Sequence, residues 1–160
     1  MKLVRPFVLT SVLALMLSGC GEDYLQAGQE AMKKEDYATA VIQLKNAVQD
    51  QPSSVPARLA LADALERSFD PAGAEQHLRK AIERGGNPDQ LLPRVAVLML
   101  ERGELEPLIR EFKDRRLDSA DADATLRALV SLAYAGQKQP ALAEEQIKGV
   151  RSDNIAVQLA

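Results

Sequence analysis

The fold is decided by two matching octapeptides, AVIQLKNA at residues 40–47 and AEQHLRKA at residues 74–81. Both carry Ala, Leu and Ala at the first, fifth and eighth positions, and the second begins 34 residues after the first. A further step of 34 residues reaches Leu108 and Phe112, which are also apolar. Apolar residues three and four positions apart form one face of a helix. The sequence therefore predicts helical units that repeat with this period.

Turn-forming residues divide these units. The interruptions are Glu35-Asp36, 51–54, Asp70-Pro71, 85–88, Gly103, 118–121 and Gly136. Asp70-Pro71 and Asn87-Pro88 each place a capping side chain before a proline at the first helical position, where the missing N–H removes no hydrogen bond. We expect eight helices of about 11 to 15 residues in four pairs. The repeats cover about 21–54, 55–88, 89–121 and 122–152, and a further helix starts within 153–160.

The composition excludes several classes of protein. The chain has 160 residues, 20 Lys and Arg against 23 Asp and Glu, a net charge of −3, one Cys and one His. One Cys cannot form an internal disulfide framework, and one Cys with one His cannot supply the usual ligands of a zinc site. The acidic balance argues against a nucleic-acid binder, which carries a basic face.

The first nineteen residues have the layout of an export signal. Lys2 and Arg5 form a positively charged start, and Phe7 to Leu17 form a short apolar run. A helix that crosses a bilayer needs about 20 apolar residues, so this run predicts a signal peptide over 1–19 and not a stable span. The remainder, 20–160, is expected to form one helical repeat domain.

The end of the signal, Leu17-Ser18-Gly19-Cys20, resembles the bacterial lipobox. The resemblance implies a covalent lipid such as palmitate on Cys20, and the alternative is an ordinary signal peptide with a chance cysteine. Gly21 stands where Asp commonly signals inner-membrane retention of lipoproteins, so the resemblance implies an outer-membrane anchor facing the periplasm. Loss of Lys2 and Arg5 takes the net charge from −3 to −5, so a basic patch cannot provide the attachment. No other cofactor and no metal are expected.

The repeat unit resembles the tetratricopeptide repeat (TPR), a helix-turn-helix unit. The resemblance rests on small and aromatic residues at packing positions of the first repeat, namely Tyr24, Gly28, Ala31, Tyr37, Ala40, Leu44, Ala47 and Pro52. It is strong in the first two repeats and degenerate in the last two, and it loses its register around Gln139-Pro140. It implies an all-α, right-handed TPR solenoid of about four repeats that serves as a non-enzymatic scaffold for protein partners.

A closer likeness lies in residues 36–49, 57–62 and 74–81. Together with the lipobox, these are similar to the N-terminal region of the TPR-repeat lipoprotein of the PEP-CTERM/exosortase system. The likeness implies a role in exopolysaccharide production and export or in exosortase-linked protein sorting. Two alternatives stay open: a TPR lipoprotein that assists pilus or secretin assembly, and a small envelope enzyme acting on glycans, or its regulator.

In the TPR family, the first helix of each repeat lines a groove for a partner. Carried onto this chain, the groove positions are Leu25, Gln29, Met32, Lys33, Leu59, Asp63, Glu66, Arg67, Val97, Leu100, Glu101, Leu126, Val130 and Tyr134. This mixture of apolar and charged residues suits an extended peptide or a partner helix. The alternative is that the apolar members pack against neighbouring repeats.

The sequence contains no Gly-rich phosphate loop with Lys, no His-Glu-x-x-His and no nucleophile elbow. His77 is expected on an exposed or half-exposed helix surface. Asp118, Asp121 and Asp123 lack the spacing of a calcium loop and are expected to cap the next helix. The basic residues of 110–116 fit a solvated helix face. Nothing in the sequence predicts the pair of converging carboxylates that glycoside hydrolysis needs.

The last residues raise a separate expectation. Ser152-Asp153-Asn154 indicates a helix start, and the apolar residues that follow continue to Ala160. Repeat arrays normally finish with a polar capping helix. We therefore expect either a fragment of a longer array or a short cap formed by these residues.

Overall fold

The computed structural model describes residues 20–150, with side chains from Asp23 onward. The expected signal peptide at 1–19 and the expected helix start at 153–160 lie outside the described residues, as does the side chain of Cys20. Within the described part the chain forms eight helices and no strand. They are α1 (Cys20–Lys33), α2 (Tyr37–Asp50), α3 (Val55–Arg67), α4 (Pro71–Glu83), α5 (Pro88–Glu101), α6 (Leu105–Phe112), α7 (Ala120–Gly136) and α8 (Pro140–Ile147).

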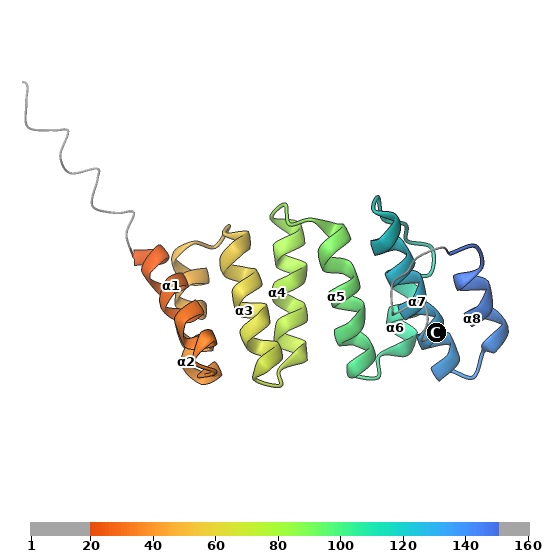
Figure 1. The fold of residues 1–160 in the computed structure, drawn as a ribbon, viewed down its shortest axis with the longest axis horizontal. Coiled ribbons are helices and arrows are strands. Elements are labelled where there is room, and N and C mark those ends of the chain that lie inside the picture. Colours follow the sequence, from red (N-terminus) through yellow and green to blue (C-terminus); the bar gives the residue numbers. More distant parts are fainter. Residues whose placement is uncertain (1–19, 151–160) are drawn as a thin grey trace, which may run out of the picture.

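The helices follow one another in a row, with α1 and α2 at one end and α8 at the other (Figure 1). The closest packing is between α1 and α2, α3 and α4, and α7 and α8, and α2 packs on α3 as α4 packs on α5. The third pair is different, because α5 packs more closely on α4 and α7 than on α6. The predicted all-α solenoid of helix pairs is confirmed. Over residues 20–150, no helix has the length and apolar character needed to cross a bilayer.

A left-handed residue stands in the turn inside each pair. Glu35, Phe69, Gly103 and Lys138 have φ values of 59°, 59°, 72° and 60°. In each turn the N–H of this residue donates to the carbonyl three residues earlier, and the next N–H donates to the carbonyl five residues before it. This arrangement satisfies carbonyls at the end of the first helix. The four positions follow the period read from the sequence, with one extra residue in the last step.

Side chains cap the starts of five helices. Asp70 accepts a hydrogen bond from the Gly73 N–H and Asn87 from the Asp89 N–H, as the sequence predicts. Asp36, Ser54 and Ser119 cap α2, α3 and α7. The expectation that the aspartates of 118–123 cap α7 is wrong, because the Ser119 hydroxyl accepts from the Ala122 N–H. Asp121 and Asp123 instead lie in the first turn, where negative charge is favourable.

Three helix lengths differ from the expected range. α6 and α8 have 8 residues each, and α7 has 17. α6 ends at the buried Phe112, and the four charged residues after it are all exposed. The basic run 110–116 therefore continues beyond the helix, contrary to the expected helix face. α8 ends shortly before Gly149, whose φ of 77° is left-handed.

Small residues let the helices approach one another. Ala40, Leu44, Ala74, Leu78 and Leu108 have no exposed surface, so the two octapeptides supply the core. A Cβ atom placed on Gly28 would lie 2.4 Å from Leu44 Cγ, so α1 contacts α2 through a position that has no room for a side chain. Burying each Leu contributes about 2 kcal/mol to stability.

Candidate partner-binding groove

The expected groove residues lie on α1, α3, α5 and α7, the first helices of the four pairs. On α1, Gln29 and Lys33 are exposed, while Leu25 and Met32 are half-buried and pack against the core. α1 lies at one end of the row (Figure 1), so these four residues stand apart from the middle of the molecule. Whether they bind a partner stays a prediction.

The middle of the groove is held together by one arginine. Nη2 of Arg94, on α5, lies 2.6 Å from Oδ1 of Asp63 and 2.5 Å from Oε1 of Glu66, both on α3. Burial opposes the charge of Arg94, but hydrogen bonds and attraction from the two carboxylates outweigh it and raise its pKa. Arg94 therefore joins the second repeat to the third. Reasoning from sequence missed Arg94, because its contacts with Asp63 and Glu66 depend on how α3 and α5 pack.

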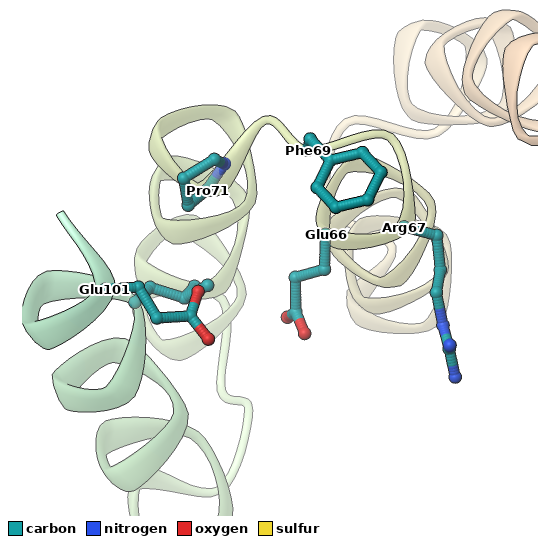
Figure 2. A pocket seen from close by; sticks show the side chains of 6 residues that line it. Glu66, Arg67, Phe69, Pro71 and Glu101 are labelled. Atoms are coloured by element: carbon teal, nitrogen blue, oxygen red, sulfur yellow. The ribbon is translucent and has the colours of Figure 1, made fainter.

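A cavity of about 490 Å³ lies beside this ion pair. Its lining comes from the end of α3, the turn after it, the start of α4 and the end of α5, and consists of Glu66, Arg67, Phe69, Pro71, Leu98 and Glu101. Figure 2 shows the Glu101 carboxylate reaching toward α3, with the Phe69 ring beside Glu66 and the Arg67 guanidinium directed away. The structure thus brings together three expected groove residues, Glu66, Arg67 and Glu101.

A second cavity of about 270 Å³ adjoins the first and shares Glu66, Leu98 and Glu101 with it. Its other lining residues are Pro93, Arg94, Val97 and Thr125. Val97 is 39% exposed, whereas Leu59 and Leu100 are half-buried and pack against the core. The two cavities together form a hollow between α3, α4 and α5 that reaches Thr125 of α7. We call this hollow the central groove.

The expected groove residues of α7 are covered. Leu126, Val130 and Tyr134 are 1%, 0% and 8% exposed and belong to the hydrophobic core. α7 packs against α5, α6 and α8, so neighbouring helices cover several of its faces. For these residues the structure matches the alternative reading, in which apolar members pack against neighbouring repeats.

Phe69 is the second residue that reasoning from sequence missed. Its side chain is 93% exposed, and it occupies the left-handed turn position. The signal was available, because a step of the repeat period aligns Phe69 with Glu35 and Gly103, and a large apolar residue in a polar turn is unusual.

On α4, a polar network ties the second repeat to the third. Glu75 is 9% exposed and accepts hydrogen bonds from Arg79 and Arg102. Arg79 also binds Glu111 of α6 through two nitrogens, at 2.6 and 2.8 Å, and Arg102 binds Glu104. Hydrogen bonds to Glu111 and Glu75 raise the pKa of Arg79 despite its burial. This network links α4 to α6. It thereby supports the third pair, whose own helices α5 and α6 pack loosely on each other.

His77 is half-buried on α4, as expected. Its Nδ1 atom is buried and has no hydrogen-bond partner among residues 20–150, and the same holds for Nε of Arg58 on α3. Burial lowers the pKa of His77, and the charges of Arg58, Lys80 and Lys45 lower it further, while Asp70 acts in the opposite direction. His77 is thus favoured in its neutral form.

Two chemical alternatives can be placed on the structure. Within residues 20–150, no group of three or more His, Cys, Asp and Glu side chains is positioned to hold a metal ion. The sequence predicts no carboxylate pair in a cleft, yet Glu66 and Glu101 line one cavity. Glu66 is engaged by Arg94, so this pair is not a free acid and base.

No protein-family model matches the chain, and no curated protein matches its sequence. Solved structures do match. The chain is similar to a structure described as the functional characterization of Pseudomonas aeruginosa PilF, with a TM-score of 0.61 and 20% identity over 89% of this chain and 62% of that one. The chain therefore spans less than two thirds of that structure. It is also similar to the TPR2B domain of yeast Sti1 in a complex with pHsp70, with a TM-score of 0.52 and 20% identity over 80% of this chain and 96% of that one. These similarities show the fold, a TPR solenoid.

Proposed function

We propose that this chain is a non-enzymatic TPR scaffold that binds protein partners through the central groove. The observation that carries the proposal is the hollow between α3, α4 and α5, whose lining combines apolar and charged side chains. Apolar contacts supply affinity in such grooves, and charges select the partner and its register. The Sti1 domain, which has the same fold, was solved in a complex with pHsp70.

We further propose that the mature chain is anchored by a lipid on Cys20 in the outer membrane, facing the periplasm. The support is the resemblance of residues 17–20 to a lipobox after a short apolar run. Several acyl chains on one residue hold a protein stably, because each buried CH₂ group contributes about 0.8 kcal/mol. Metabolic labelling with a palmitate analogue tests the anchor. We expect label on the full chain and none on Cys20→Ala, and labelling of the variant would contradict the proposal.

The partner system is tested by in-cell crosslinking of the tagged full chain, followed by capture from detergent-treated envelopes and mass spectrometry. We propose first that the partners belong to a system for exopolysaccharide production and export or for exosortase-linked sorting. We therefore expect components of such a system to be recovered. Recovery of pilus or secretin subunits would replace it with the second candidate. A wild-type chain that captures no envelope protein would contradict the scaffold function itself.

The glycan-acting alternative has one structural observation in its favour, the presence of Glu66 and Glu101 at one cavity. The purified chain is expected to release no soluble sugar from envelope polysaccharide. Turnover that is lost in both Glu66→Gln and Glu101→Gln would establish the enzyme and overturn the scaffold proposal.

A further inference from the structure

We infer that the central groove binds a cationic segment of a partner protein, with a Lys or Arg side chain entering between α3 and α5 beside Phe69. This inference rests on the proposed scaffold function and specifies the chemistry of the partner. Three features of the structure carry it: the exposed Phe69 ring, the shape of the cavity and its charge.

The Phe69 ring is presented to solvent by its backbone. Its side chain is 93% exposed with a φ of 59°, a conformation that is unfavourable for residues with a Cβ atom. The equivalent turn positions hold Glu35, Gly103 and Lys138, two charged residues and a glycine. The turn itself therefore does not require an aromatic residue. An exposed aromatic ring at the rim of a cavity is typical of an anchor for a partner.

The cavity has the form that a long cationic side chain needs. Pro71 and Leu98 provide apolar walls, and Glu66 and Glu101 provide carboxylates from opposite sides (Figure 2). Lys and Arg bury their alkyl stems against apolar surface and keep the charged end hydrated or paired. The face of a Phe ring attracts a cation within about 6 Å of its centre.

The charge of the central groove favours a cation over an anion. Among the charged residues that line the groove, Glu66 and Arg94 pair with each other, and Arg94 also binds Asp63, which lines neither cavity. Glu101 is exposed and forms no ion pair within the described part of the chain, so its negative charge is left at the cavity. Arg67 lines the cavity, but its guanidinium points away from it (Figure 2). A partner that placed a carboxylate here would meet like charge.

The inference is tested on the purified full chain with two fluorescein-labelled peptides, GSLRALRLSG and its acidic copy GSLEALELSG. We expect the cationic peptide to bind at least about tenfold more tightly by fluorescence anisotropy, and to weaken as salt is raised. Equal binding of the two peptides, or no binding of the cationic one at millimolar concentration, would overturn the inference.

Two variants locate the binding to this cavity. Phe69→Gly and Glu101→Gln are each expected to weaken the cationic peptide by about fivefold or more. The matched controls are Glu35→Gly, at the same turn position of the first repeat, and Glu83→Gln, an exposed glutamate at the far end of α4. Both controls are expected to bind as the wild type does. Circular dichroism and the melting temperature verify that each variant is folded.

The in-cell capture separates this inference from the scaffold proposal. If Phe69→Gly and Glu101→Gln lose a partner that the wild type captures, the central groove is its docking site. A photo-crosslinking residue in place of the exposed Ala72, on the first turn of α4, should then link to a Lys- or Arg-containing segment. If both variants keep every partner, the inference fails while the scaffold function stands.

Discussion

At the scale of single residues, the four equivalent turn positions share one backbone conformation but carry different side chains. Each turn needs a left-handed residue, and only the third repeat uses glycine for it. Glu35, Phe69 and Lys138 adopt the same conformation with a Cβ atom present, which costs about 1 kcal/mol each. At Phe69 this unfavourable conformation is kept although the aromatic ring is almost fully exposed and buries little surface in the folded chain.

Phe69→Gly is accordingly expected to raise the free energy of unfolding by about 0.5 to 1 kcal/mol, since glycine removes the strain and loses some of that gain to its own entropy. The melting temperature should rise by about 2 °C. Glu35→Gly should give a similar gain, because it relieves the same strain. Thermal and denaturant unfolding measure both variants. A less stable Phe69→Gly would show that the ring stabilises the fold.

His77 makes the stability of the chain depend on pH. Its folded-state pKa is depressed, first by burial and then by the nearby Arg58, Lys80 and Lys45. A base with a depressed pKa binds its proton more weakly in the folded state than in the unfolded state, so the stability that its neutral form contributes is fully present above its unfolded pKa of about 6.5. That contribution is lost as the pH falls through the folded-state pKa.

His77→Gln should therefore weaken the fall in melting temperature between pH 7.5 and pH 5, because Gln does not titrate there. The measurement is thermal unfolding of both chains over this range. Asp70 is the one nearby group whose charge raises the pKa of His77. Parallel profiles for the two chains would show that His77 does not carry the dependence.

At the scale of helices, periodicity predicted most of what was found. The spacing of Ala40, Leu44 and Ala47 identified a helix face, and the proline-preceding caps at Asp70 and Asn87 fixed two starts. Helix ends were less predictable: α6 stops at Phe112, its last buried residue, and four exposed charged residues follow it. The central groove was predicted only in part. Glu66 could be placed by register, but its partner Arg94 is 28 residues away, and such contacts depend on how two helices pack.

The network around Glu75 is a polar link between helices that centres on a largely buried carboxylate. Glu75→Ala would leave Arg79 and Arg102 without their shared, largely buried carboxylate. We expect the free energy of unfolding to fall by about 1 to 3 kcal/mol, below the value for a fully buried pair because Arg79 is partly exposed.

Glu83→Ala is the matched control for this variant, because Glu83 lies on the same helix and is exposed. It should change the free energy of unfolding by less than about 0.5 kcal/mol. Denaturant unfolding compares the two. An equally small effect of Glu75→Ala would mean that water replaces the network without loss.

At the scale of the whole molecule, the row of helices means that each repeat is stabilised mainly by its neighbours. In such arrays, stability is close to a sum of repeat terms and nearest-neighbour interfaces, so different parts open at different free energies. α5 buries six residues and packs on both α4 and α7, whereas Ala143 is the only buried residue of α8. Native-state hydrogen exchange should therefore show stronger protection in α4 and α5 than in α8.

Val95→Ala tests the nearest-neighbour character directly. Val95 is fully buried in α5, and its truncation should cost about 1 to 2 kcal/mol through lost contacts and a small cavity. Because α5 packs on α4 and α7, protection should fall there while α1 keeps its own exchange rates. An equal fall in every helix would show instead that the array unfolds as one cooperative unit. In that case the helices that line the central groove, which spans the second and third repeats, could separate only when the whole chain unfolds.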